Sequence, residues 1–201
     1  MTANPLPHPL RLTGTGVVLR EWRPDDLDDL VALLDEPEIA RWTPMPSPFD
    51  AESGLAYLKR AYQGRTNGTR IQLAITVAGG RPLGEVLLFG VNADLREAEL
   101  GYLVGRPYRR RGLASAALAA LSGYACGTLR LRRLLLRIDP ENTASTSVAR
   151  RCGYWLTGEA PIHQEGPYGP IRLETWEYVD GRSGTRPERR GNVAARRYGR
   201  R

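Results

Sequence analysis

The stretch Arg109-Arg110-Arg111-Gly112-Leu113-Ala114 joins a strand-like run, residues 99–105, to a helix-like run, residues 113–121. The first N–H groups of a helix have no partner within the helix, and the helix dipole favours negative charge there. The arginines stay charged at any physiological pH and can fork onto phosphate oxygens. A strand that turns through this loop into a helix therefore predicts a pyrophosphate site.

Two common phosphate loops do not fit this stretch. A Walker A loop ends in Gly-Lys-Ser/Thr, and the chain has a single lysine, Lys59, far from the stretch. A dinucleotide fingerprint needs three glycines in the G-x-G-x-x-G spacing, which Gly105 and Gly112 do not supply. These six residues alone also fit an arginine-rich turn at the start of a surface helix.

The net charge of +7 comes from one end of the chain. Residues 181–201 hold eight arginines and one glutamate, which gives 8 − 1 = +7, so residues 1–180 sum to about zero. This Gly/Arg-rich tail is almost free of apolar residues, so we expect it to be disordered. The tail fits either weak contact with RNA or the ribosome, or a solvated extension without a role.

Composition excludes several other classes. No apolar run approaches the roughly 20 residues of a membrane span, and the proline-rich N-terminus lacks the apolar region of a signal peptide. Cys126 and Cys152 fall in expected helices. We expect them to pack as small apolar side chains and not to form a disulfide. His8 and His163 are isolated, so neither a metal site nor a His-based triad is expected. We expect a cytoplasmic protein without a metal.

Periodicity and capping residues predict one α/β (α+β) domain over residues 14–180, after a flexible segment over residues 1–13. Helices are expected after Asp25, where Pro37 ends the first, and after Asp50, with a proline-stiffened loop at residues 41–48 between them. The other expected elements are strands at 16–21, 70–77, 83–91, 97–104, 133–138, 154–158 and 171–179, and helices at 113–121 and 145–152. Their order predicts a mixed sheet with helices on both faces.

A second block, residues 139–154, carries Asn142 and Ser145 at the start of a helix and Gly153-Tyr154 at its end. As plain structure, Asn142 or Thr143 is an N-cap and Gly153 a C-cap. The block also resembles the Asn-x-x-Ser…Gly-Phe/Tyr block of the RimJ/RimL-type GNAT (GCN5-related) N-acetyltransferases. It follows the Arg-x-x-Gly-x-Ala loop, which resembles their acetyl-CoA pyrophosphate loop, after about 30 residues. Glu99-Leu-Gly-Tyr102 is similar to the strand before that loop, and the resemblance covers roughly residues 14–180.

The resemblance implies the GNAT fold, a mostly antiparallel sheet of about six or seven strands, with acetyl-CoA as co-substrate. The strands that end near Val104 and Ile138 would splay apart, and the pantetheine arm would pair with the backbone of Leu103 and Val104. N–H groups of residues 109–114 would hold the pyrophosphate, and Asn142 would bind the arm from the other side. The acceptor amine would attack the thioester directly in a ternary complex, helped by a backbone N–H near Val104.

The resemblance also suggests acid–base groups. Glu99 is the first candidate for the base, through a water, although it could instead be a strand carboxylate paired with an arginine. Glu85 and Glu165 are the second and third candidates. Position 149 is alanine where related enzymes place a tyrosine acid, so Ser145 is the candidate acid, unless it is only a first-turn helix residue.

The acceptor stays open at this point. An α-amine with a pKa of about 7.7–8.0 is about a quarter neutral at pH 7.4, whereas a lysine-type amine is neutral about once in a thousand. A protein N-terminus therefore needs less help from a base than a small polyamine does. The loop at residues 42–49, which begins with Trp42, is expected to form the acceptor pocket together with Tyr57 and the loop at residues 166–169. The alternative is a catalytically weak CoA-binding or RNA-associated module that uses the tail, and homodimerisation stays open.

Overall fold

The computed structural model describes residues 9–180, so the basic tail expected over residues 181–201 lies outside the described residues, as do residues 1–8. The strands are β1 (Arg11–Gly14), β2 (Val17–Glu21), β3 (Ile71–Thr76), β4 (Pro82–Asn92), β5 (Glu97–Val104), β6 (Arg133–Ile138), β7 (Trp155–Leu156), β8 (Ile162–Gly166) and β9 (Gly169–Val179). The α-helices are α1 (Leu27–Leu34), α2 (Pro37–Trp42), α3 (Ala51–Thr66), α4 (Leu113–Gly127) and α5 (Thr143–Arg151), and short 3-10 helices cover Pro24–Asp26 and Arg106–Tyr108.

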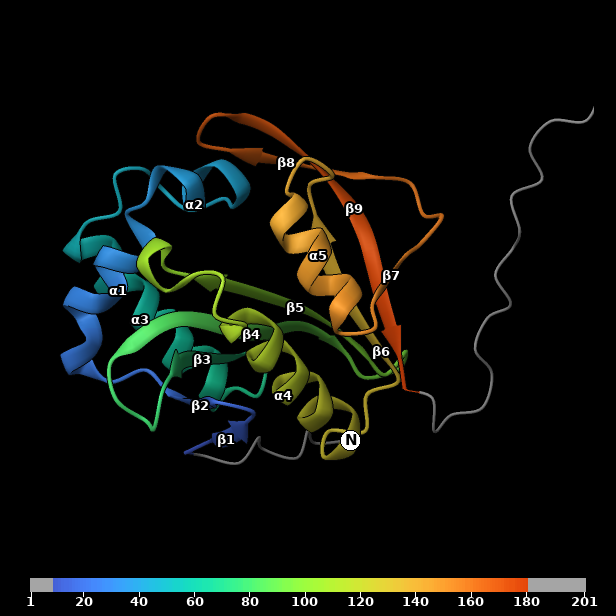
Figure 1. Cartoon of the computed structure of the whole chain (residues 1–201), viewed down its shortest axis with the longest axis horizontal. Helices are drawn as coiled ribbons and strands as arrows, with labels where there is room; N and C mark the ends of the chain where they lie inside the picture. The colour runs from blue at the N-terminus through green and yellow to red at the C-terminus, as the bar shows by residue number, and fades with distance from the viewer. Residues whose placement is uncertain (1–8, 181–201) are drawn as a thin grey trace, which may run out of the picture.

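The strands form one mixed sheet in the order β1-β2-β3-β4-β5-β6-β9-β7, with β8 paired to β9 (Figure 1). The neighbouring strands pair antiparallel except β5 and β6, which run parallel. The expected count of six or seven strands is therefore too low, because β1 and β8 were not predicted. Both strands are short and largely exposed, so neither shows the apolar alternation that marks a half-buried strand. Three of the four residues of β1 also fall in the segment 1–13 that was expected to be flexible.

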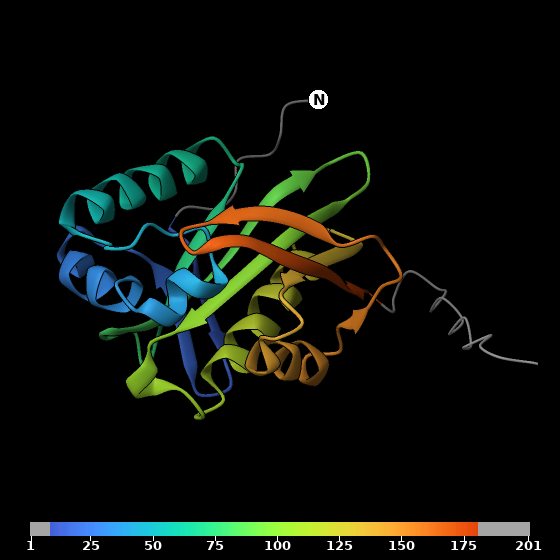
Figure 2. The ribbon, with the colours of Figure 1, turned by 90° about the horizontal axis from the view of Figure 1, so that it is seen from above.

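Helices cover both faces of the sheet, as predicted (Figure 2). On one face, Leu118 and Leu121 of α4 and Ala149 of α5 are fully buried in the main core, which includes alternate residues of β3 to β6. On the other face, α1, α2 and α3 enclose a smaller core around Leu30, Phe49 and Tyr57. One face of β5 and β6 is therefore covered by α4 and α5, and the other face is covered by α1 to α3.

Local sequence signals account for most helix boundaries. Asp50 Oδ1 accepts a hydrogen bond from Ser53 N at 2.8 Å and begins α3, as predicted. Cys152 is the C-cap of α5, and Gly153 follows it with φ +82°, so the predicted helix-ending glycine lies one residue past the cap. Pro37 was expected to end a helix, but instead it occupies the first turn of α2, where its missing N–H costs nothing. The predicted loop at residues 41–48 is therefore helical over Arg41 and Trp42.

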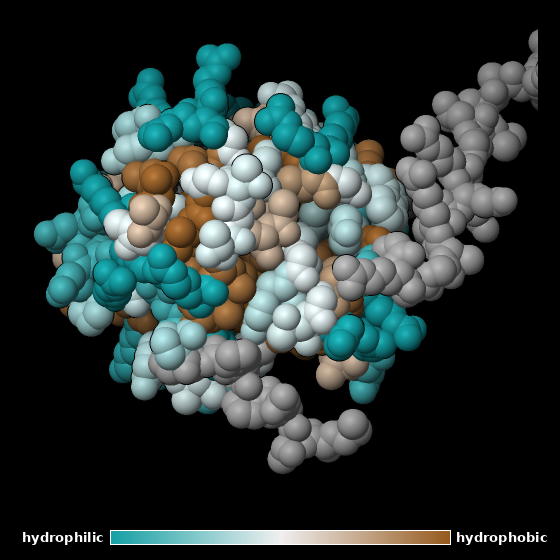
Figure 3. Space-filling view, turned by 60° about the horizontal axis from the view of Figure 1, so that its bottom comes forward, coloured by the Kyte–Doolittle hydropathy of each residue, from teal (hydrophilic) through white to brown (hydrophobic). Residues whose placement is uncertain are grey.

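The surface of residues 9–180 is mixed in character. Figure 3 shows one face on which charged side chains border a band of apolar ones, an ordinary pattern for a folded protein. Within the described ranges, no helix is both long and apolar enough to cross a membrane. Cys126 and Cys152 are both free thiols, which confirms that they do not form a disulfide.

Candidate active site

The parallel strands β5 and β6 separate after three residue pairs. Their register runs Glu97–Arg133, Ala98–Leu134 and Glu99–Leu135, and the pairing stops there although both strands continue. β6 pairs with β9 along its whole length, and β5 stays paired with β4 as far as Val104. From residue 100 onwards, β5 therefore has an open side within the described sheet.

The backbone of Val104 turns to this open side. Gly105 N donates to Leu83 O of β4 at 3.0 Å. Because backbone groups in an antiparallel ladder alternate in direction, the groups of Leu103 point to β4 and those of Val104 point away from it. Of the two backbone positions that the sequence suggested for a pantetheine arm, Val104 is the one that faces the opening.

The predicted phosphate loop follows β5 directly and ends at the start of α4. Gly112 is the N-cap of α4 with φ +77°, and a side chain built there would meet nothing within 4 Å. No side chain caps this helix end, so the N–H groups of Leu113, Ala114 and Ser115 face the loop. These free N–H groups and the positive end of the helix dipole fit a diphosphate. The side chains of Arg110 and Arg111 are exposed beside them and add positive charge.

The guanidinium of Arg109 is bonded to other protein groups and does not point freely into the phosphate loop. Its Nε donates to Val104 O at 2.9 Å and its Nη2 to Glu36 Oε2 at 2.8 Å, and its Nη1 contacts Glu38. Glu36 also accepts from Arg106 N at 2.9 Å. The guanidinium thus ties the loop to the start of α2, which leaves the backbone N–H of Arg109 as its candidate contact with a phosphate.

On the other side of the opening lies the start of α5. Asn142 Oδ1 accepts from Ser145 N at 3.0 Å, which confirms Asn142 as an N-cap. This bond uses the side-chain oxygen and leaves the amide nitrogen as a donor for a ligand. Tyr102 of β5 reaches across and donates its hydroxyl to Ser145 O at 2.9 Å. Burial raises the pKa of the Tyr102 phenol, so it stays a donor.

Glu99 lies on the opposite face of the sheet from α5. Its neighbours Ala98 and Leu100 belong to the main core beneath α4, so Glu99 points to the face of α1 to α3. Its Oε2 lies 3.5 Å from Arg137 Nε, a long ion pair. Burial raises the pKa of Glu99, and the Arg137 guanidinium opposes that rise. The structure therefore brings Glu99 to Arg137 but does not bring it to Ser145.

Glu85 is the most buried carboxylate among the candidates, at 1% exposure. It accepts hydrogen bonds from Tyr57 Oη at 2.7 Å, Trp22 Nε1 at 2.8 Å and Gln72 Nε2 at 3.4 Å. Burial raises its pKa to about 6, and the three donors oppose the rise. Tyr57 is thereby committed to the interior instead of the expected acceptor pocket. Glu165, the third candidate, lies exposed on β8.

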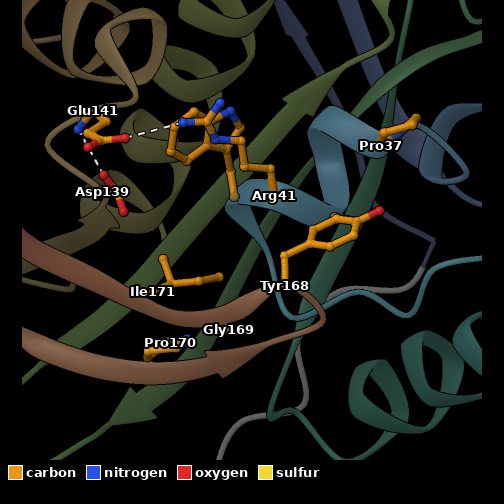
Figure 4. Close-up of a pocket in the computed structure, with 10 residues that line it drawn as sticks. Pro37, Arg41, Asp139, Glu141, Tyr168, Gly169, Pro170 and Ile171 are labelled. Atoms are coloured by element: carbon orange, nitrogen blue, oxygen red, sulfur yellow. Dashed lines mark hydrogen bonds and ion pairs between the residues drawn. The ribbon is translucent and has the colours of Figure 1, made fainter.

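A pocket of about 400 Å³ opens at the carboxyl end of β6, between α2 and the β8–β9 turn (Figure 4). Trp42, Tyr168 and Gly169 line it, as the sequence predicted for an acceptor pocket. Ser47 Oγ and Tyr168 Oη lie 3.2 Å apart, so the two expected loops meet. The lining also contains Arg41, Asp139 and Glu141, which no sequence pattern indicated as pocket residues.

The sequence predicts on which face of a strand a side chain lies, but it does not predict contacts between distant elements. The alternation within β5 and β6 places Tyr102 and Arg137 on defined faces, so their directions were predictable. No sequence pattern indicates that Glu36 binds Arg109, because this contact depends on how the α1–α2 connection packs against the phosphate loop. The same is true of Glu141, which meets Arg41 only in the folded chain.

Comparison with known proteins identifies a matching family model and several relatives. Residues 17–154 match the family model described as an acetyltransferase (GNAT) domain. The curated protein named "Uncharacterized N-acetyltransferase p20" from Bacillus licheniformis is 25% identical over 146 residues, which are 71% of this chain and 80% of that protein.

Solved structures share the fold. RimJ of Mycobacterium smegmatis in complex with CoA-disulfide superposes with a TM-score of 0.76 at 22% identity, over 87% of this chain and 88% of that one. The ribosomal-protein-S5-alanine acetyltransferase from Vibrio fischeri gives a TM-score of 0.74 at 15% identity, over 85% and 96% of the two chains. At these identities the likeness is one of fold.

Proposed function

This chain belongs to the GNAT family of acetyl-CoA-dependent N-acetyltransferases, and from that premise we propose that its acceptor is the N-terminal α-amine of a protein. Acetyl-CoA supplies the acetyl group as a thioester, and an amine receives it. What the family leaves open is which amine is acetylated, and which side chains of this chain bind and assist.

The observation that carries the proposed CoA site is the early end of the β5–β6 pairing. The open side of Val104, the uncapped start of α4 and the Asn142 cap of α5 all border that opening. In the proposal, N–H groups of residues 109–114 hold the pyrophosphate. The backbone N–H of Val104 and the amide nitrogen of Asn142 flank the pantetheine arm, while the Val104 carbonyl keeps its bond to Arg109 Nε. A Val104 N–H directed at the thioester oxygen would stabilise charge that develops there.

We assign proton transfer from the amine to Glu99, through a water. Its side chain lies on the same face as the pocket at the end of β6, and burial raises its pKa towards the range useful for a base. The ion pair with Arg137 is long enough for the carboxylate to exchange it for a water contact. Ser145 remains the candidate acid for the departing thiolate. Its backbone is held by Tyr102 and Asn142, which fixes where its hydroxyl can reach.

Three considerations favour a protein α-amine over a lysine-type amine. An α-amine has a substantial neutral fraction at neutral pH, so a single carboxylate with water suffices as base. The pocket between α2 and the β8–β9 turn is open at the surface, as a protein terminus requires. The S5-alanine acetyltransferase with the same fold takes its name from a ribosomal-protein acceptor.

The test mixes the protein with acetyl-CoA and a panel of peptides, aminoglycosides and polyamines and follows the release of free thiol. We expect release with peptides that have a free N-terminus and none with the same peptides blocked at that amine. Glu99→Gln should reduce kcat by about a hundredfold or more without loss of CoA binding. Thiol release with polyamines alone would overturn the proposed acceptor, and CoA binding without release from any amine would favour a binding module.

A further inference from the structure

The pocket at the end of β6 has a chemistry of its own. Ten residues line it, from α2, from the segment between β6 and α5, and from the β8–β9 turn (Figure 4). Glu141 directly precedes Asn142, the proposed pantetheine contact, so the pocket borders the opening between β5 and β6. A group bound in it would therefore sit beside the acceptor amine.

The lining carries more negative than positive charge. Asp139 and Glu141 contribute two carboxylates, and Arg41 contributes the single guanidinium in the lining. Asp139 Oδ1 accepts from Glu141 N at 2.8 Å, which fixes the turn that holds both carboxylates at the rim. The aromatic rings of Trp42 and Tyr168 complete the walls, and Tyr168 is 65% exposed.

Arg41 shows which kind of group these walls accommodate. Its guanidinium lies 4.4 Å from the centre of the Trp42 ring and its Nη2 lies 3.2 Å from Glu141 Oε2. A cation stacked on an aromatic face and paired with a carboxylate is a complete recognition unit for an arginine or lysine side chain. The chain places one of its own arginines in that unit.

The bond that keeps Arg41 there is weak. Its side chain is 60% exposed and that of Glu141 is 73% exposed. Ion pairs with this exposure contribute little stability, because water and salt screen them. A cation on an incoming chain can therefore replace Arg41 on Glu141 at small cost.

We infer that this pocket binds a basic side chain near the N-terminus of the acceptor, which takes the place of Arg41 against Glu141. The inference rests on the proposed function, because it places the reacting α-amine at the β5–β6 opening. It adds a preference for acceptors that carry arginine or lysine within the first few residues. An acidic side chain at that position would face two carboxylates and bind poorly.

The experiment compares peptides that are identical except at their second or third residue, which is arginine, citrulline or glutamate. Citrulline has nearly the shape of arginine without its charge, so the ratio of kcat/KM values isolates the charge. For the wild-type protein we expect arginine to exceed citrulline by about fivefold at low salt, with glutamate lowest. The ratio should fall as salt rises.

Two variants test the assignment to particular side chains. Glu141→Gln should bring the arginine-to-citrulline ratio close to one, whereas Arg41→Ala should raise the ratio because the internal competitor is gone. Glu52→Gln, on the exposed first turn of α3, is the matched control and should keep the wild-type ratio. Circular dichroism confirms that each variant is folded.

The outcomes separate the two proposals. Release of thiol from all three peptides at equal kcat/KM, or a preference for glutamate, would overturn the basic-residue pocket and leave the acceptor proposal intact. No release from any peptide would overturn the acceptor proposal first.

Discussion

Glu85 shows how one buried carboxylate couples the fold to pH. Its pKa is raised from 4.5 to about 6 by burial. The folded state therefore holds this proton more tightly than the unfolded state does. The stability from this group is fully present below about pH 4.5 and is lost as the pH rises through about 6.

The Glu85→Gln variant cannot ionise at this position, so it should not show that loss. A shift of about 1.5 pKa units corresponds to about 2 kcal/mol. We expect the unfolding free energy of the wild-type protein to fall by about this amount relative to the variant between pH 4.5 and pH 7. Urea titrations of both proteins across that range measure the difference, and a difference that does not change with pH would contradict the prediction.

Gly112 adopts a left-handed backbone conformation at the start of α4, where we propose that the pyrophosphate binds. Gly112→Glu should abolish acetyl-CoA binding, because the new carboxylate would face the proposed pyrophosphate. Gly16→Glu is a matched control, since Gly16 also has a positive φ, +73°, and open space around it. Each substitution should cost roughly 1–2 kcal/mol of stability through its left-handed conformation.

Calorimetry with CoA and thermal unfolding of both glycine variants separate binding from folding. We expect similar melting temperatures and binding only in Gly16→Glu. Retained CoA affinity in Gly112→Glu would mean that the pyrophosphate lies elsewhere.

At the scale of elements, the start of α5 has a structural and a proposed binding role in one residue. Asn142→Ser keeps an oxygen that can accept from Ser145 N but removes the amide donor. We expect it to stay within a few tenths of a kcal/mol of wild-type stability while its affinity for acetyl-CoA falls roughly fivefold. Asn142→Ala should lose the same affinity and about 1 kcal/mol of stability as well. Equal CoA affinity in the wild-type and Ser variants, by calorimetry, would limit Asn142 to capping.

The bounds of the strands at the opening follow from the sequence, whereas those of one helix and the partners of Arg109 do not. β5 and β6 were predicted with their observed bounds, because β5 begins with alternating polar and apolar residues, β6 contains a short apolar run, and turn signals flank both. α2 is not evident from the sequence, because a proline after a helical pattern usually marks its end, whereas Pro37 occupies the first turn of α2. The guanidinium of Arg109 was assigned to phosphate because its charge is visible in the sequence, whereas Glu36 and Glu38 reach it only through tertiary packing. Residue type and local order were thus predictable, and partners across the fold were not.

At the scale of the whole molecule, charge is distributed very unevenly. The +7 net charge equals the sum over residues 181–201, and residues 1–180 hold 21 basic and 21 acidic side chains. Every residue proposed to bind acetyl-CoA or the acceptor lies within residues 9–180. In the proposal, the local positive charge of the phosphate loop comes from the arginines beside Gly112.

A variant that ends at Asp180 should accordingly acetylate short peptides with the same kcat and KM as the full chain. If the tail recruits an acidic partner or RNA, its effect is confined to large acceptors, and it should weaken as salt rises. The measurement compares thiol release for both chains with a short peptide and with an intact ribosome-sized acceptor at low and high salt. A large loss of activity towards the short peptide would place part of the site in the tail. If the two chains are equally active at every salt concentration, with the short peptide and with the large acceptor alike, the tail has no catalytic role.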